Sequence, residues 1–155
     1  MTTRIEDVEM GENVFIGENV VIRNGCIIGD NVVIGHNTVI EEDVVIREGT
    51  RIQAMCYITK GMLIEGNVFI GPCFQSTNDK QIMSHGRGEF KIEAPRILYG
   101  ARIGGGVILL PGVTIGRNAM IGAGSVVIDD VGEGELWYGA KKAQFKGMVP
   151  AEEWL

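Results

Sequence analysis

The segment Thr77-Asn78-Asp79, followed six positions later by His85, gathers side chains that could take part in a reaction. An asparagine offers a carbonyl oxygen that can orient an amine, and the carboxylate of Asp79 can accept a proton or a hydrogen bond. Histidine loses its proton near neutral pH, so His85 is a second candidate base. The alternative is that Asn78 and Asp79 only turn the chain, and that His85 is an ordinary loop residue.

These residues interrupt a regular repeat. Isoleucine recurs every six residues from Ile16 to Ile70, ten times without a gap, and the same beat returns from Ile97 to Val127. A period of six fits neither a plain helix nor a long flat strand, but it fits a coil of three short strands with a turn after each. We therefore predict an all-β fold, a parallel β-helix of about six coils over residues 10–78 and 95–130, in a single domain.

The repeat also assigns places to residues within each coil. The isoleucines are predicted to point inward, and the Gly, Asn or Asp that follows is predicted to take the unusual backbone angles of the turns. Cys26 and Cys56 fall on a small inward position two residues before an isoleucine, which favours inert packing. His36 lies two residues after Ile34 and is predicted to be a surface turn residue.

The interruption has a defined length. About 15 residues more than the beat requires lie between residue 76 and Ile97, and the beat then resumes in phase. We predict a loop over about 79–93 that leaves the prism, and an excursion of this length is usually functional or disordered. The tail over 131–155 is predicted to end in a short helix within 146–155, with Trp154 packing back on the body.

Composition limits the classes of function. The net charge is −6 and no basic stripe appears, so nucleic-acid binding is not expected. The sequence contains no run of about 18 apolar residues, so no membrane span is predicted. No signal peptide is evident. Three cysteines at no metal-ligand spacing favour free thiols in a reducing compartment and a cytoplasmic location.

Two stretches carry a family resemblance. "IGPCFQSTND" at 70–79 resembles a segment of hexapeptide-repeat acetyltransferases that act on amino groups of nucleotide-linked sugars, and "ILLPGVTIGRNAMIGAGSVVIDDV" at 108–131 resembles their last coils. The resemblance implies a left-handed coil, acetyl-CoA as co-substrate, a small-molecule sugar acceptor and a homotrimer. Two features depart from that family, because "YGAKKAQ" at 138–144 replaces a Gly-Asn-Pro-Ala segment and no Pro-Arg follows Asn78-Asp79.

The resemblance also implies where the cofactor would lie, in a groove between neighbouring prisms of the trimer. Small residues would let the pantetheine arm approach the backbone at Gly104, Gly105, Ala123 and Gly124, with the N–H of Gly105 or Ala123 as a candidate oxyanion donor. Lys141 and Lys142 could meet the CoA phosphates. The alternative is that this lysine pair belongs to a solvated tail.

The expected function is therefore acetyl transfer from acetyl-CoA to an amino group of a nucleotide-linked sugar. One alternative is an O-acetyltransferase with His85 as the base, and another is a non-catalytic scaffold subunit of the same fold. The gamma-class carbonic anhydrases share the prism, but they need three zinc-binding histidines and this chain has 2. No metal is expected.

Overall fold

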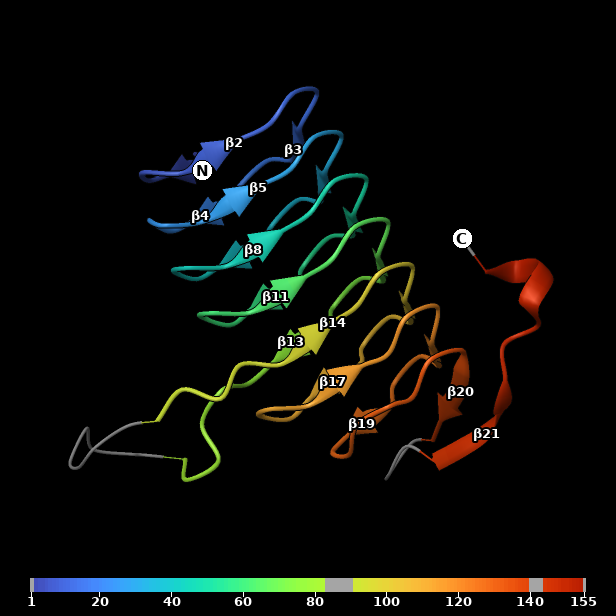
Figure 1. Cartoon of the computed structure of the whole chain (residues 1–155). Coiled ribbons are helices and arrows are strands. Elements are labelled where there is room, and N and C mark those ends of the chain that lie inside the picture. The colour runs from blue at the N-terminus through green and yellow to red at the C-terminus, as the bar shows by residue number, and fades with distance from the viewer. Residues whose placement is uncertain (1, 83–90, 140–143, 155) are drawn as a thin grey trace.

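The computed structural model describes residues 2–82, 91–139 and 144–154, and in them the chain winds into stacked coils (Figure 1). Three sheets, called A, B and C, form the three sides of a prism. Sheet A contains β1 (Arg4–Ile5), β4 (Val21–Ile22), β7 (Val39–Ile40), β10 (Tyr57–Ile58), β13 (Gln75–Ser76), β16 (Ile108–Leu109) and β19 (Val126–Val127). Sheet B contains β2 (Glu9–Met10), β5 (Ile27–Ile28), β8 (Val45–Ile46), β11 (Leu63–Ile64), β14 (Arg96–Ile97) and β17 (Thr114–Ile115). Sheet C contains β3 (Phe15–Ile16), β6 (Val33–Ile34), β9 (Arg51–Ile52), β12 (Phe69–Ile70), β15 (Arg102–Ile103), β18 (Met120–Ile121), β20 (Glu135–Tyr138) and β21 (Gln144–Met148).

The core is the stack of inward side chains predicted from the repeat. In a typical two-residue strand the second residue points inward, and Ile34, Ile46 and Ile58 are fully buried. The residue two positions earlier is buried as well, as at Val32 and Cys56. Each buried isoleucine contributes roughly 1.5–3 kcal/mol to folding. The all-β β-helix prediction is confirmed.

The coil count is higher than the repeat predicted. Sheet A has seven strands, so the prism has about seven turns rather than six. The spacing of the repeat changes at both ends of the prism, where Ile5 pairs with Ile22 and Trp137 pairs with Ile121. These spacings of 17 and 16 differ from the 18 that joins Ile46 to Ile64, so a strict period of six does not detect the first and last coils.

The glycines that follow isoleucines have a different role from the one predicted. At Gly17 and Gly35 an added Cβ would lie 2.6 and 2.5 Å from a backbone nitrogen of the next coil, so glycine is required by close approach. The left-handed backbone angle falls two residues later, at Asn19 (φ 57) and Asn37 (φ 57). Asparagine tolerates that conformation better than most residues.

The predicted C-terminal helix within 146–155 is confined to three residues. β21 (Gln144–Met148) pairs antiparallel with β20, and only a short 3₁₀ turn, η1 (Ala151–Glu153), follows it. Pairing with β20 satisfies the backbone groups that a helix would otherwise have to satisfy. Trp154 does lie against the body, since its indole N–H donates to the Val149 carbonyl at 2.8 Å and its ring covers Gly134.

The excursion leaves the prism between β13 and β14 without disturbing it (Figure 1). Ile64 pairs with Ile97, 33 positions later, whereas Ile46 pairs with Ile64, 18 positions later, so 15 residues are extra. Register is kept on both sides, because Ser76 pairs with Leu109 in sheet A. Within the described part of the chain, no helix is long and apolar enough to cross a membrane.

Candidate functional site

The turn that follows each sheet A strand is called here the A–B corner, and the excursion starts at one such corner. Thr77 continues the ladder of sheet A, since its N–H and its hydroxyl both donate to the Leu109 carbonyl at 3.1 Å. Ser76 Oγ accepts from the Thr59 N–H at 2.9 Å and donates to the Tyr57 carbonyl at 3.2 Å. The start of the excursion is therefore fixed to the coils on either side of it.

Asn78 is the first residue to leave the regular path. Its side-chain Nδ2 donates to the Lys60 carbonyl in the preceding coil at 3.4 Å. Its backbone carbonyl accepts from the N–H of Glu93, on the returning segment of the excursion, at 2.9 Å. Because Nδ2 is the end that contacts the coil, the acceptor end of the amide, Oδ1, is the end that can receive a hydrogen bond from a ligand.

Asp79 lies next to Asn78 and turns the chain. Its Oδ1 accepts from the Gln81 N–H at 2.7 Å, an arrangement typical of an Asx turn. Asp79 therefore has both features considered from the sequence. It forms a turn, and it lines the two hollows beside it.

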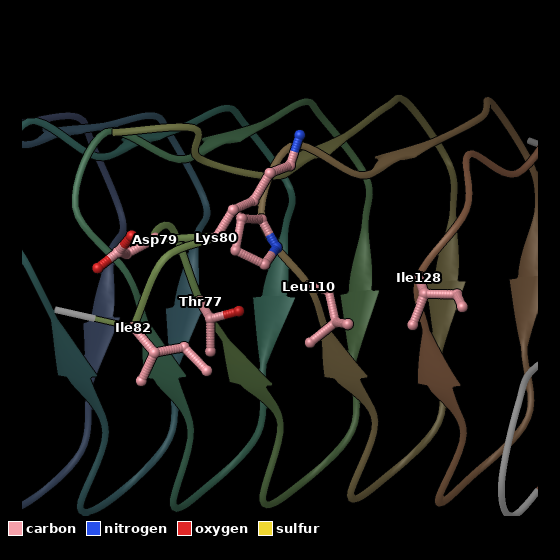
Figure 2. A pocket seen from close by; sticks show the side chains of 7 residues that line it. Thr77, Asp79, Lys80, Ile82, Leu110 and Ile128 are labelled. Carbon is pink, nitrogen blue, oxygen red and sulfur yellow. The ribbon is translucent and has the colours of Figure 1, made fainter. Parts of the chain in front are cut away.

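Two hollows flank the segment Thr77–Ile82. The first, of about 430 Å³, is called here the polar hollow, because every lining residue except Ile82 carries a polar side-chain group: Tyr57, Thr59, Ser76, Thr77, Asn78, Asp79 and Ile82. The second, of about 310 Å³, is mainly apolar and is lined by Thr77, Asp79, Lys80, Ile82, Leu110, Pro111 and Ile128. Figure 2 shows Leu110 and Ile128 reaching the second hollow from successive coils, with Ile82 and Thr77 beside them. The structure thus places Asn78 and Asp79 together on one hollow at the face of sheet A.

Tyr57 contributes a phenol to the polar hollow. Burial, together with the neighbouring Glu41 carboxylate, raises the pKa of Tyr57 above its ordinary value. Its hydroxyl donates to Glu41 Oε1 at 3.2 Å. Tyr57 therefore stays protonated at neutral pH and can act in this hollow as a hydrogen-bonding group rather than as a base.

Glu93 is a residue that the sequence reasoning did not single out. Its carboxylate lies 2.5 Å from the Lys80 ammonium and 3.2 Å from that of Lys91. These cations lower the pKa of Glu93 below its ordinary value. Its backbone contacts both Asn78 and Gly112. No sequence pattern links Glu93 to Asn78, 15 positions earlier, because their contact depends on how the excursion folds back on the prism.

The predicted cofactor residues gather at another corner, the turn that follows each sheet C strand, called here the C–A corner. Gly104 and Gly105 lie in one coil, and Ala123 and Gly124 lie at the same corner of the next coil. An added Cβ on Gly104 would lie 2.5 Å from the Ala123 nitrogen. Nothing lies within 4 Å of the corresponding point on Gly124. The corner is thus tight between coils and open on its outer side.

The backbone N–H groups of this corner differ in their partners. Gly104 donates to the Ile121 carbonyl at 2.8 Å and Gly124 donates to the Gly105 carbonyl at 2.9 Å. The N–H groups of Gly105 and Ala123 make no hydrogen bond within residues 2–82, 91–139 and 144–154.

An earlier coil shows, at its own C–A corner, what such an amide can bind. There the Glu18 N–H is capped by His36 Nδ1, 18 positions on, at 2.8 Å. The residue 18 positions after Gly105 is Ala123, which carries no acceptor on its side chain.

The two groups of predicted residues are not brought together within one chain. Asn78 and Asp79 lie at an A–B corner, whereas Gly104, Gly105, Ala123 and Gly124 lie at a C–A corner, at the opposite end of the sheet A strands. His85, Lys141 and Lys142 lie outside the described residues. Among the residues that are described, no cluster of three or more His, Cys, Asp or Glu side chains could hold a metal ion.

Comparison with known sequences identifies the repeat. The profile of the family described as "Bacterial transferase hexapeptide (six repeats)" matches residues 7–42, 25–60 and 100–129. The galactoside O-acetyltransferase of Lactococcus lactis is 51% identical over 37 residues, which is 24% of this chain and 18% of that protein. A candidate acetyltransferase of Schizosaccharomyces pombe is 40% identical over 81 residues, 50% of this chain and 39% of that protein. The chain therefore spans less than half the length of these relatives.

Solved structures share the fold. A mutant of AntD, an N-acyltransferase from Bacillus cereus, in complex with dTDP and coenzyme A, superposes with a TM-score of 0.82 at 19% identity, covering 93% of this chain and 85% of that one. A hexapeptide-repeat containing acetyltransferase from Vibrio cholerae has a TM-score of 0.61 at 24% identity, covering 75% of this chain and 73% of that one. At these identities the similarity establishes the β-helix and leaves the substrate open.

Proposed function

The chain belongs to the bacterial transferase hexapeptide family, and from that premise we propose that it is an acyl-CoA-dependent acetyltransferase. We further propose that the acceptor is an amino group of a nucleotide-linked sugar. The observation that carries this proposal is the position of Asn78 and Asp79 together on the polar hollow beside sheet A. Acetyl-CoA is the expected donor, and the AntD structure, which contains coenzyme A, supports that choice.

The reaction requires few catalytic groups from the protein. The amine lone pair forms a bond to the thioester carbonyl carbon, the carbonyl oxygen becomes an oxyanion, and the C–S bond then breaks to release the CoA thiolate. A thiol has a pKa of about 8.5, so its thiolate leaves without a strong general acid. The nitrogen loses a proton to Asp79, or to a water molecule bound to Asp79. The thiolate then takes up a proton.

The residues have distinct roles in this proposal. Asn78 Oδ1 would accept a hydrogen bond from the amine and aim its lone pair at the carbonyl carbon. The N–H of Gly105 or Ala123 would stabilise the oxyanion, because both amides lie at the C–A corner without a partner in the described chain. Gly104 and Gly124 would let the pantetheine arm lie against the backbone.

The separation of the two corners favours a site shared between chains. The acceptor residues and the donor residues lie at opposite ends of sheet A within one chain. In a homotrimer, a neighbouring prism would bring its own corner against this face, and the cofactor would lie between them. The trimer is part of the proposal.

A second candidate is acetylation of a hydroxyl, which the Lactococcus lactis galactoside O-acetyltransferase favours. A hydroxyl needs a base to remove its proton during attack, and His85 would then be that base. Asn78→Ala and His85→Ala separate the two functions when acetyl-CoA-dependent thiol release is measured over amino-sugar nucleotides and simple sugars.

For an amine acceptor we expect Asn78→Ala to lose most of the activity and His85→Ala to keep much of it. The reverse pattern would establish the hydroxyl acceptor. Absence of thiol release with every acceptor of either kind would reject both.

A further inference from the structure

We infer that Glu93 is a positioning residue that closes the excursion at its base and thereby fixes Asn78 for the acceptor. This inference rests on the proposed function, because it assumes that Asn78 orients the acceptor. Glu93 touches neither hollow as a lining residue. It would therefore act through Asn78 and Lys80 rather than on the substrate.

The backbone of Glu93 makes two hydrogen bonds that join separate segments of the chain. Its N–H donates to the Asn78 carbonyl at 2.9 Å, and its own carbonyl accepts from the Gly112 N–H at 2.7 Å. Three chain segments therefore meet at Glu93: the start of the excursion, its return, and the A–B corner of the next coil. This is the place where the described ends of the excursion are joined to each other and to the prism.

The carboxylate of Glu93 forms ion pairs with two lysines. Its Oε2 atom is buried, although the side chain as a whole is 26% exposed. The Lys80 ammonium lies 2.5 Å from this atom, and the pair rests on Gly112, whose added Cβ would lie 3.6 Å from Glu93 Oε2 and from Lys80 Nζ. Lys91 contacts the other oxygen from a side chain that is 84% exposed, so solvent weakens that contact. The Lys80–Glu93 pair is thus a second contact, beside the Glu93–Asn78 hydrogen bond, that links the two sides of the base.

The consequence for Asn78 follows from its place in the chain. Lys80 is two residues after Asn78 and Glu93 bonds directly to the Asn78 backbone, so the ion pair and the hydrogen bond hold the same short segment. Loss of the pair would let this segment shift relative to Lys60, which holds the Asn78 side chain at 3.4 Å. A shift of about 1 Å at a positioning group can reduce a rate by about a hundredfold.

The test is the kinetic effect of Glu93→Gln on the full-length protein. We expect kcat to fall about tenfold and the KM for the acceptor to rise, while acetyl-CoA binding by calorimetry stays unchanged. The matched control is Glu65→Gln, since Glu65 is also 26% exposed and pairs with Arg117 at 3.7 Å, but at a corner away from both hollows. Glu65→Gln should leave kcat and both KM values as in the wild type.

A double-mutant cycle separates positioning from direct contact. Lys80→Gln removes the same ion pair from a side chain that is 62% exposed, so it should fold even if Glu93→Gln does not. If the pair acts as one unit, the double variant should lose no more activity than either single variant. Additive losses would mean that Lys80 acts on the acceptor by itself, and the role assigned to Glu93 would be rejected.

The outcomes also separate this inference from the proposed function. An inactive wild-type protein that binds no acetyl-CoA would reject the proposed function and with it the role of Glu93. An active protein in which Glu93→Gln keeps wild-type kcat and KM would reject the inference alone. Trypsin cleavage after Lys91 gives a readout that does not need activity: we expect it to be several times faster in Glu93→Gln than in the wild type, and equal rates would contradict the closure.

Discussion

At the scale of single residues, Asn78 is held by its own side chain and by its backbone. Nδ2 binds the Lys60 carbonyl at 3.4 Å, and the backbone carbonyl binds the Glu93 N–H at 2.9 Å. A side chain fixed in this way loses little freedom when a ligand arrives, which is what orientation of an amine requires. The identity of the residue was visible in the sequence, but its two anchors were not.

The three cysteines provide a residue-scale prediction. Cys26 and Cys56 are buried and Cys73 is exposed. Burial raises the pKa of both buried thiols, to about 11 for Cys56, so each is protonated and unreactive near pH 8. We expect iodoacetamide at pH 8 to modify Cys73 alone in the native protein and all three cysteines after unfolding, as counted by mass spectrometry. Modification of Cys56 in the folded protein would contradict the packing described here.

At the scale of elements, glycine has two different roles at the C–A corner. Gly104 has no space for a Cβ, because that atom would lie 2.5 Å from the Ala123 nitrogen, whereas Gly124 has space but a φ of +71°. We expect Gly104→Ala to destabilise the protein by about 3 kcal/mol through displacement of the coils. Gly124→Ala should cost only about 1 kcal/mol for the left-handed backbone. Urea unfolding of the two variants measures the difference, and equal losses would contradict this assignment.

The excursion should be dispensable for folding. Thr77-Asn78-Ala94 takes the place that Thr59-Lys60-Gly61 takes one coil earlier, and Gly61 has a φ of +76°. Deleting residues 79–93 and replacing Ala94 with glycine should therefore restore an unbroken corner. We expect a thermal midpoint within a few degrees of the wild type and no acetyl transfer. A variant that unfolds would show that the prism depends on the excursion, and one that stays active would move the acceptor site elsewhere.

The repeat decides which parts of the elements could be predicted from the sequence. The inward isoleucines, the buried positions of Cys26 and Cys56 and the phase across the excursion came from local period alone. The first coil and the last were missed, because the pairs Ile5–Ile22 and Trp137–Ile121 depart from the spacing of 18.

The hairpin of β20 and β21 and the contacts of Glu93 depend on partners far along the chain or across the excursion. No local pattern contains that information. The parts of the candidate site that lie within a repeat could therefore be predicted, and the contacts that close it could not.

At the scale of the whole molecule, the described chain leaves the candidate acceptor and donor residues on different corners of one prism. A shared site between chains explains this arrangement, and the proposal is a homotrimer. We expect sedimentation equilibrium to give about three times the chain mass of 16.8 kDa at micromolar concentration. A stable monomer that still transfers acetyl groups would contradict the shared site.

The central claim is that this β-helix uses acetyl-CoA, and calorimetric titration of the full-length protein with acetyl-CoA tests it most directly. We predict saturable binding with one acetyl-CoA per chain. The heat should be lost in a Gly105 variant that blocks the C–A corner and should persist in Asn78→Ala, which affects only the acceptor. No binding at millimolar acetyl-CoA to the assembled wild-type protein would contradict the account and leave a scaffold of the same fold as the better description.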